Sequence, residues 1–516
     1  MMRVLSTVSL VLFLSTCWLC SYVTLPSPRH MLEKVQIWLA LENGVIDVQP
    51  KPLLSTPWTG NAELSTNRRS LHIVKDGANL LKKIKSPMGV LVDPKNVTES
   101  VSLQDLEAPP GKLWLPVSVG KSNGKRGEGR RGRAFDNILV AYCLMDMDAY
   151  HEKPWAFAMG TSLQRRSGCN RNKDLTRTYR LNSLMDILED HPSSFLDPTG
   201  FIYHQTRCGS TLTANMLAAV PTNIVHSETP PPVSVLNLCK KSCSEEDRSI
   251  FLRTILRLMS PAQNGHSHSF FKFQSSKYVK EVEAAWPSVK WVYLFRDPLE
   301  VMASNLKGAW RRQIEPKRTI VRGGPIRAQQ NQKLEDMGYN MAGPCLRGLK
   351  DRGPIGNRSQ TKEVSSPREV AHYCAKHLQS LNVLALHQIQ GGSPNGLVVE
   401  YSQLPEALID YIYPVHFGME EDGSHKADYP KWMEPVSHYY SKGMGKGDFS
   451  EMTKEFSQGM DLEMKANGTD TAMQQIAKDV LCSSYQSLQK LEVWHKEREG
   501  QTMGTCLHKT HEETKS

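Results

Sequence analysis

Short apolar segments alternate with amphipathic ones between residues 200 and 401 of this 516-residue chain, and this alternation restricts the fold more than any other feature of the sequence. Apolar segments of this length, rich in β-branched and aromatic residues, predict buried strands. Strands that alternate with helices form parallel sheets, and the helices cover both faces. The sequence therefore predicts an α/β fold, a parallel β-sheet flanked by helices, with ligands at the carboxyl ends of the strands. The five predicted strands are GFIYHQ, TNIVHSE, SFFKFQ, VKWVYLFR and GLVVEY.

The first predicted strand leads into a small polar loop and then a helix, in the sequence FIYHQTRCGSTLTANMLAAV at residues 201–220. A Gly–Ser–Thr run that begins a helix leaves backbone N–H groups unpaired at the positive end of the helix dipole. Arg207 adds a full positive charge next to them. The strand, loop and helix therefore predict a site for an anion such as phosphate.

Two known anion-binding loops differ from this one at essential positions. A loop for nucleoside triphosphates has the pattern GxxxxGK[ST], whereas here the basic residue, Arg207, precedes Gly209. A cysteine phosphatase would have an arginine six residues after Cys208, where this chain has Ala214. The first difference weakens a kinase or nucleotide hydrolase hypothesis, and the second excludes a cysteine phosphatase.

A second strand-to-helix corner follows the predicted strand VKWVYLFR. Arg296 ends that strand, and Ser304 follows eight residues later in the next predicted helix. Asp297 is a suitable N-cap, and Pro298 suits the first helical position. Because an arginine can hold a phosphate through paired charge-assisted hydrogen bonds, this corner predicts a second anion site.

Together the two corners resemble the donor site of sulfotransferases that use 3′-phosphoadenosine 5′-phosphosulfate (PAPS). In that family a Lys or Arg, a small residue, Gly and two hydroxyl residues bind the 5′-phosphosulfate, while an Arg and a Ser eight residues later hold the 3′-phosphate. The resemblance implies a P-loop NTPase-like sulfotransferase fold over residues 200–401, PAPS as the co-substrate and no metal. It implies donor contacts by Arg207, Cys208, Gly209, Ser210, Thr211, Arg296 and Ser304.

Two further charged residues resemble catalytic residues of tyrosylprotein sulfotransferases. Glu228 lies 21 residues after Arg207, which is similar to the spacing of the glutamate that takes the acceptor hydroxyl's proton in those enzymes. Lys272, on the strand before Arg296, matches a lysine that contacts the transferring sulfuryl group. The resemblance therefore implies that Glu228, Arg207 and Lys272 are the catalytic residues.

Alternatives remain open at three of these positions. His226 would share a face with Glu228 if the strand continued, which makes it a rival general base or a packing residue. Lys272 either meets a counter-charge, since an unpaired buried charge is costly, or extends past its neighbouring phenylalanines to water. Cys208 occupies a position that is often serine in the family, and its thiol is expected to make the loop sensitive to oxidation.

The net charge of +10 is concentrated in two stretches, which carry six basic and one acidic residue and seven basic and one acidic residue, respectively. Lys121–Arg133 is rich in glycine and predicts a flexible linker. No aromatic residues interleave with its charges, so we expect no nucleic-acid partner. Arg311–Lys333 either attracts an acidic acceptor or is a solvated loop. The sequence HSH at residues 266–268 lacks further ligands at a metal-binding spacing and predicts a polar loop.

The N-terminal region predicts entry into the secretory pathway. Residues 4–25 carry no charge and are long enough to cross a bilayer, which takes about 20 apolar residues. Either cleavage as a signal peptide or retention as a type II signal anchor fits, giving a secreted protein or a single-pass Golgi membrane protein with a lumenal domain. Sequons for N-glycosylation agree with this compartment and lie at Asn96, Asn357 and Asn467.

Nine cysteines lie outside the leader, so at least one thiol is free or pairs with another chain, and Cys239 and Cys243 are the nearest candidate pair. The predicted organisation is a signal segment at 1–25, an irregular stem with the basic linker at 26–134, a sulfotransferase domain at 135–495 and a polar tail at 496–516. A helix in TDTAMQQIAKDVLCSSYQSLQKLEVW is expected to close the domain.

The expected function is sulfuryl transfer from PAPS to a hydroxyl of a glycan or of a protein tyrosine. Two other hypotheses are an inactive sulfotransferase-like protein that binds glycans through Arg311–Lys333 and a nucleotide-dependent kinase. No short motif distinguishes a sugar acceptor from a tyrosine, and the oligomeric state is equally open.

Overall fold

The computed structural model describes just over half of the chain, and the described residues belong to one unit, Leu81–Ser516. They are 84–85, 91–92, 97–98, 100–121, 138–157, 160–169, 171–239, 243–273, 275–306, 345, 367–419, 428–437, 471–493 and 506.

A five-stranded parallel sheet forms the centre of this unit, and each of the five predicted strands is present in it. The strands lie in the order β11-β10-β7-β9-β8, and every neighbouring pair is parallel. Their bounds are β7 Gly200–His204, β8 Asn223–Ser227, β9 His268–Lys272, β10 Lys290–Phe295 and β11 Gly396–Glu400. The predicted α/β class is therefore confirmed.

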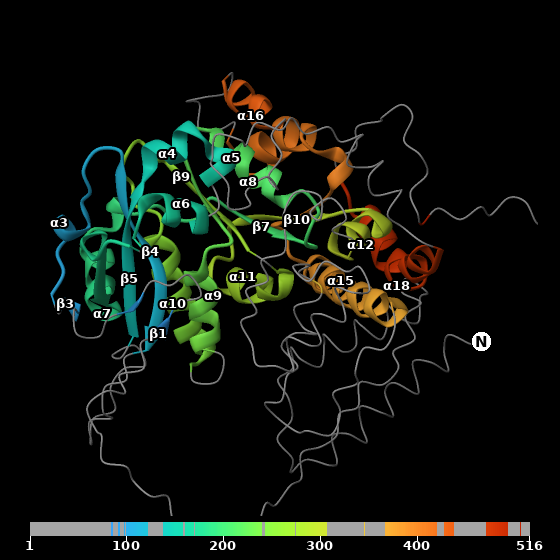
Figure 1. Cartoon of the computed structure of the whole chain (residues 1–516), viewed down its shortest axis with the longest axis horizontal. Helices are drawn as coiled ribbons and strands as arrows, with labels where there is room; N and C mark the ends of the chain where they lie inside the picture. The colour runs from blue at the N-terminus through green and yellow to red at the C-terminus, as the bar shows by residue number, and fades with distance from the viewer. Residues whose placement is uncertain are drawn as a thin grey trace, which may run out of the picture. The chain divides into compact units, whose positions relative to one another are not determined.

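Helices cover both faces of this sheet, which explains why its strands are apolar on both sides. On β7, Ile202 packs on one face with α8 (Ser210–Ala219), the π-helix η7 (Leu408–His416) and α16 (Tyr429–Ser437). Phe201 and Tyr203 pack on the other face. Figure 1 shows α8 and α16 on one side of β7 and β10, and α11 and α15 on the other. The helices of this second face are α10 Glu245–Leu258, α11 Val279–Ala285, α15 Pro367–Gln390 and α18 Thr471–Gln489.

The strand order creates a topological switch point between β7 and β10. These two strands are neighbours, with His204 opposite Leu294. From β7 the chain continues to β8 at one edge of the sheet, whereas from β10 it continues to β11 at the opposite edge. In open parallel sheets, ligands bind at such a switch point, beyond the carboxyl ends of the strands. Both predicted anion-binding corners follow these two strands.

A second, four-stranded sheet has the order β3-β6-β5-β4. Its strand β4 shows that the predicted start of the domain at residue 135 is wrong. β4 (Lys112–Lys121) lies within the stem predicted at 26–134, yet it pairs with β5 (Ile138–Asp146) across the basic linker. Pro116 and Gly120 weaken the strand pattern in the sequence. Pro116 is tolerated because β4 is an edge strand whose register shifts between Pro116 and Ser118. The other strands are β6 Thr176–Arg180 and β3 Val97–Thr98.

The remaining elements are shorter. β1 and β2 form a separate antiparallel pair, Ile84–Lys85 with Leu91–Val92. The remaining α-helices are α3 Leu103–Leu106, α4 Met147–Glu152, α5 Pro154–Phe157, α6 Gly160–Ser167, α7 Leu181–Asp190, α9 Pro230–Cys239 and α12 Pro298–Leu306. The 3₁₀ turns are η1 Lys173–Leu175, η2 Pro192–Ser194, η3 Ser276–Tyr278 and η6 Tyr401–Gln403.

Four disulfides account for eight of the nine cysteines outside the leader, and Cys208 is free and buried. This agrees with the odd count in the sequence, and the predicted nearest pair, Cys239 and Cys243, is bonded. The other bridges are Cys143–Cys169, Cys345–Cys374 and Cys482–Cys506. Because Cys506 is bridged to α18 and buried, the segment predicted as a polar tail is attached to the domain at this residue. The predicted closing helix is α18.

Other sequence predictions concern residues that the structure does not describe. They are the leader at 1–25, the three sequons, the basic linker beyond Lys121 and the stretch Arg311–Lys333. Within the described part of the chain, no helix is both long enough and apolar enough to span a bilayer.

A tyrosine hydroxyl joins α4 to the parallel sheet, and this bond gives a prediction about stability. The Val225 N–H on β8 donates to Tyr150 Oη at 2.9 Å, and Tyr150 is fully buried. We expect Tyr150→Phe to lower the free energy of unfolding by about 1–3 kcal/mol, because it leaves a buried N–H unsatisfied. Urea denaturation followed by circular dichroism measures the change.

Tyr142→Phe is the matched control. Tyr142 is equally buried on β5, but its hydroxyl has no hydrogen-bond partner among the described residues. Its substitution should change stability by less than about 0.5 kcal/mol. Equal losses in the two variants would contradict the assigned role of the Tyr150 hydroxyl.

Candidate active site

The loop between β7 and α8 is held in a left-handed conformation by its neighbours. Thr206, Arg207 and Gly209 have φ of 71°, 56° and 82°, which is strained for the first two because they carry a Cβ. The Thr206 N–H donates to His204 Nδ1 at 3.0 Å. The Gln205 N–H and the Cys208 thiol both donate to the Leu294 carbonyl, at 3.0 and 3.1 Å. The loop conformation is thus fixed from the neighbouring strand β10.

Gly209 is required at the N-cap of α8 for two reasons. Its φ is positive, and a Cβ placed on it would lie 2.2 Å from Cδ2 of Tyr401. Tyr401 also lies beneath the Arg296 guanidinium, whose carbon is 3.9 Å from the ring centroid. One aromatic ring therefore contacts both predicted anion-binding corners.

The first turn of α8 presents backbone N–H groups and two hydroxyl residues. Gly209 is the N-cap, Ser210 is the first helical residue and is buried, and Thr211 is half-buried. An α-helix of ten residues with this terminus has the partial positive charge that favours an anion. The predicted strand, loop and helix are confirmed, with Arg207 half-buried immediately before the helix.

The second corner is built as the sequence predicts. Asp297 accepts from the Leu299 and Glu300 N–H groups at 2.9 and 3.2 Å, and α12 begins at Pro298. Arg296 is buried, and its Nε donates to Glu300 Oε2 at 2.5 Å. Ser304 is also buried.

Ser304 Oγ has no hydrogen-bond partner among the described residues. Buried hydroxyls are nearly always satisfied in folded proteins, so this oxygen is a feature that a ligand would explain.

Direct hydrogen bonds join the two corners to each other. The Arg296 N–H donates to Gln205 Oε1 at 3.2 Å, and Thr206 Oγ1 lies 3.4 Å from Asn305 Oδ1 on α12. Gln205 and Thr206 directly precede Arg207 in the chain, and Asn305 directly follows Ser304. Although about 90 residues separate the two segments in the chain, they form a single site at the switch point.

A buried cluster of Lys272, Glu228 and His204 lies at the carboxyl ends of β9, β8 and β7. Lys272 Nζ is 2.6 Å from Glu228 Oε1 and 3.4 Å from Thr211 Oγ1, and its side chain is 0% exposed. His204 Nε2 lies 3.6 Å from Glu228 Oε1. Lys272 therefore has a counter-charge, and the alternative of an extension to water is wrong.

His204 is the member of this cluster that sequence reasoning missed. The signal was present, because His204 is a polar residue at the carboxyl end of an otherwise apolar strand, as Lys272 is. Glu228 itself leaves the strand, with a φ of 53° and its N–H bonded to the Lys272 carbonyl at 2.9 Å.

The electrostatics of the cluster fix its charge state. Burial alone would raise the pKa of Glu228, but the Lys272 charge and the contact with His204 together hold that pKa well below its usual range. Burial lowers the pKa of His204, against the opposing effect of Glu228. At neutral pH the carboxylate is therefore ionised and the imidazole neutral. Because Nδ1 accepts from Thr206, the proton lies on Nε2, which faces Glu228.

Cys208 differs from its predicted behaviour. Its thiol is fully buried, and burial raises its pKa to about 11. Because the thiolate is the form that oxidises, a protonated thiol bonded to the Leu294 carbonyl is poorly reactive. The expected sensitivity to oxidation is therefore wrong, and Cys208 acts in the free protein as a small residue that secures the loop.

His226 lies beside the cluster but not in it. Its ring stacks on Phe271 with centroids 4.8 Å apart, and burial lowers its pKa to about 3. Both His226 and Glu228 line a small cavity of ≈ 10 Å³ together with Lys272. His226 is thus close enough to a ligand there to contact it, but it is neutral and a weak base.

The HSH sequence also differs from the predicted polar loop. His266 is buried with Nε2 3.2 Å from His151 Nε2, and His268 begins β9. Among the described residues no group of three or more His, Cys, Asp or Glu side chains is arranged to hold a metal ion.

Comparison with known proteins adds little to this geometry. No family model and no curated protein sequence matches the chain. Among solved structures, the sulfotransferase domain from the curacin biosynthetic pathway is similar at 13% identity, covering 58% of this chain and 98% of that domain, with a TM-score of 0.25. The fold class given above rests on the strand order of the chain itself.

Gly209 provides a test of the loop. We expect Gly209→Ala to destabilise the protein by more than about 2 kcal/mol, because a left-handed alanine costs about 1–2 kcal/mol and the clash with Tyr401 adds to it. Gly265→Ala is the control, since Gly265 has a φ of +78° with nothing within 4 Å of its Cβ position. Thermal unfolding compares them, and equal losses would show that the Tyr401 contact is unimportant.

The Lys272–Glu228 pair provides a second test. We expect Lys272→Met and Glu228→Gln each to cost about 3–5 kcal/mol at pH 7, because each leaves a buried charge without its partner. The double variant should lose much less than the sum of the two. Denaturant unfolding of the four proteins gives the coupling energy, and strict additivity would exclude a direct pair. Lys112→Met is the control, because the more exposed Lys112–Asp146 pair should contribute about 0–1 kcal/mol.

The same pair predicts a pH dependence. The folded pKa of Glu228 is depressed from its ordinary value of 4.5, so its stabilisation is present above that value and is lost as the pH falls through the folded pKa. The stability of the wild type relative to the double variant should accordingly decline only below pH 4.5.

Proposed function

We propose that the chain is a sulfotransferase that moves a sulfuryl group from PAPS to a hydroxyl acceptor. The observation that carries this proposal is the joining of two basic strand-to-helix corners. Hydrogen bonds link the corner of Arg207 to that of Arg296, beside the Lys272–Glu228 pair. A donor with two separate anionic groups requires two such corners in one site, whereas a single phosphate requires only one.

The residues of the site fit this donor. The N–H groups at the start of α8, with Arg207, Ser210 and Thr211, would hold the phosphosulfate, and Gly209 leaves room there for a close approach of the backbone. Arg296 and Ser304 would hold the 3′-phosphate. The unpartnered Ser304 Oγ supports this assignment, and so does the buried Arg296 guanidinium, whose carboxylate partner Glu300 is itself a group that an anion can replace.

The reaction requires one proton acceptor and several stabilising charges. The acceptor oxygen forms a new bond to sulfur, the bond between sulfur and the phosphate oxygen breaks with its electron pair remaining on that oxygen, and the hydroxyl proton passes to Glu228. Lys272 and Arg207 offset the charge on the departing oxygen. Positioning supplies most of the remaining rate enhancement, as it does in phosphoryl transfer.

Lys272 is placed to control the basicity of Glu228. Its ammonium bonds to Glu228 Oε1 and lies 3.4 Å from Thr211 Oγ1, in the first turn of α8. An anion at that helix terminus would attract the ammonium away from the carboxylate. The pKa of Glu228, which Lys272 holds low in the free protein, would then rise toward the range of a useful general base. We therefore assign the proton acceptor to Glu228 and not to His226.

The cellular location belongs to the same proposal. Four disulfides are typical of proteins that fold in an oxidising compartment. Together with the uncharged segment at residues 4–25 they support a secretory location, either as a single-pass Golgi protein with a lumenal active site or as a secreted enzyme.

Two substitutions should separate donor binding from chemistry. Arg296→Ala should weaken the binding of adenosine 3′,5′-bisphosphate by about 10- to 150-fold, because charge-assisted hydrogen bonds contribute about 1.5–3 kcal/mol. Glu228→Gln should lower kcat by about 10²- to 10⁴-fold while the nucleotide still binds. Calorimetry measures affinity, and radiolabelled PAPS with a panel of glycans, tyrosine peptides and alcohols measures turnover.

Arg257→Ala is the control for the loss of a positive charge, since Arg257 lies on α10, outside the site, and contacts Asp197 and the Pro192 carbonyl. Unchanged nucleotide affinity in Arg296→Ala would refute the donor site. Unchanged kcat in Glu228→Gln would remove the base assignment. Magnesium-dependent binding of ATP would favour a kinase instead.

A further inference from the structure

Gln205 lies between the two basic corners, and only one end of its side-chain amide is hydrogen-bonded. Oε1 accepts from the Arg296 N–H at 3.2 Å, and the Gln205 backbone N–H donates to the Leu294 carbonyl at 3.0 Å. The residue is 1% exposed, and its Nε2 has no hydrogen-bond partner among the described residues. Since buried amide groups are nearly always hydrogen-bonded in folded proteins, these N–H groups require an explanation.

The partner of Oε1 fixes the orientation of this amide. A backbone N–H can only donate, so the atom that faces the Arg296 N–H is the amide oxygen, and the NH₂ group is at the other end. The oxygen and the nitrogen of one amide are only about 2.2 Å apart. The unpartnered NH₂ group therefore lies at the Arg296 corner as well.

Ser304 supplies a second unpartnered group in the same region. Thr206, which follows Gln205, lies 3.4 Å from Asn305, which follows Ser304. Ser304 Oγ is buried and has no hydrogen-bond partner among the described residues. An amide NH₂ group and a hydroxyl can donate to different oxygens of one ligand group. A phosphate monoester, with three acceptor oxygens, meets this requirement.

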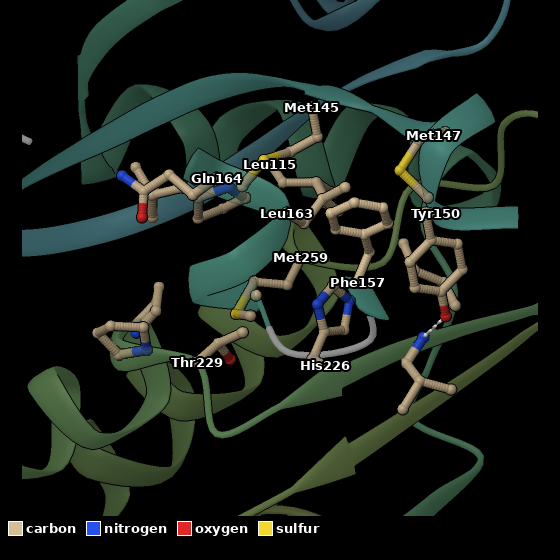
Figure 2. A pocket seen from close by; sticks show the side chains of 17 residues that line it. Leu115, Met145, Met147, Tyr150, Phe157, Leu163, Gln164, His226, Thr229 and Met259 are labelled. Atoms are coloured by element: carbon tan, nitrogen blue, oxygen red, sulfur yellow. Dashed lines mark hydrogen bonds between the residues drawn. The ribbon is translucent and has the colours of Figure 1, made fainter. Parts of the chain in front are cut away.

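Another unpartnered group in the structure has different surroundings. His226 Nε2 is also buried and without a partner among the described residues, but in Figure 2 its ring lies with Phe157 and Met259 beside an apolar cavity. None of the described residues that line this cavity is charged. The Gln205 amide is instead bonded to the backbone of Arg296, where a positive charge favours an anion.

We propose that Gln205 is a further donor-binding residue, whose NH₂ group donates to the 3′-phosphate and makes the site select nucleotides that carry this group. The proposal rests on the proposed donor site. A nucleotide with a free 3′-hydroxyl has one oxygen at this position and no charge, so it cannot satisfy Gln205, Ser304 and Arg296 together. Sites with polar groups that an analogue leaves unpaired discriminate strongly against that analogue.

A neutral amide adds selectivity that Arg296 alone does not supply. Arg296 already pairs with Glu300, so a phosphate that binds there replaces one anionic partner with another. The NH₂ group of Gln205 has no such competitor among the described residues. Its hydrogen bond to a phosphate oxygen is therefore gained without the loss of another bond within the protein.

One substitution and two nucleotides test this role. Gln205→Met should weaken the binding of adenosine 3′,5′-bisphosphate by about 10- to 150-fold, the range expected for one hydrogen bond to a charged group. Adenosine 5′-monophosphate lacks only the 3′-phosphate and should bind the variant and the wild-type chain equally. Calorimetry measures both affinities, and thermal unfolding checks that the variant is folded.

Gln164→Met is the matched control. Gln164 is 2% exposed and lies on α6, where Figure 2 shows it beside the apolar cavity, outside the site. Its substitution should change neither affinity. Equal weakening of both nucleotides in Gln205→Met would overturn the proposal, because it would show that Gln205 only holds the two corners together.

A crystal structure of the wild-type chain with adenosine 3′,5′-bisphosphate tests the contact without any substitution. Gln205 Nε2 should lie about 2.7–3.2 Å from a 3′-phosphate oxygen, and a separation of more than about 3.5 Å from every phosphate oxygen would overturn the proposal.

The wild-type affinities separate this proposal from the proposed function. If the bisphosphate binds and Arg296→Ala weakens it while Gln205→Met does not, the donor site stands and the role of Gln205 is wrong. If the wild-type chain does not bind the bisphosphate, both are wrong.

Discussion

The Leu294 carbonyl is the point on which the rest of the site depends. It accepts hydrogen bonds from the Gln205 N–H and the Cys208 thiol, two residues of a loop whose backbone is strained at Thr206 and Arg207. Strand β10 thus fixes the loop that follows β7, and β10 itself continues into the second basic corner. One backbone carbonyl on β10 therefore fixes the position of the β7–α8 loop relative to the corner that follows β10.

A strand order with a switch point makes this arrangement possible. The order β11-β10-β7-β9-β8 places the ends of β7 and β10 side by side. The loops after these two strands, although distant in the chain, therefore lie next to each other, and so do the N-termini of the helices α8 and α12 that follow them. The Lys272–Glu228 pair arises from the same geometry, because Lys272 ends β9 and Glu228 follows β8. The residues of the candidate site lie together at one edge of the sheet because the parallel strands all end there.

The sequence predicted the parts of this structure that depend on local pattern. The five central strands, the helix after Gly209, the cap at Asp297 and the closing helix all follow from apolar periodicity and capping chemistry. It missed β4, because Pro116 and Gly120 interrupt the pattern and only pairing with β5 overrides them. It missed the roles of His204 and the low reactivity of Cys208 for a different reason: both depend on burial and on partners distant in the chain, which no local pattern encodes.

The contact between Arg296 and Glu300 has a consequence for how a nucleotide would enter. In the free protein Glu300 already neutralises the guanidinium, as Glu228 neutralises Lys272. An arriving phosphate therefore exchanges with an internal carboxylate and does not meet a bare cation. The affinity for a nucleotide should accordingly depend less on ionic strength than the number of basic groups suggests. Selection among anions should depend on their shape, because each anion that binds must replace a carboxylate that already pairs with the cation.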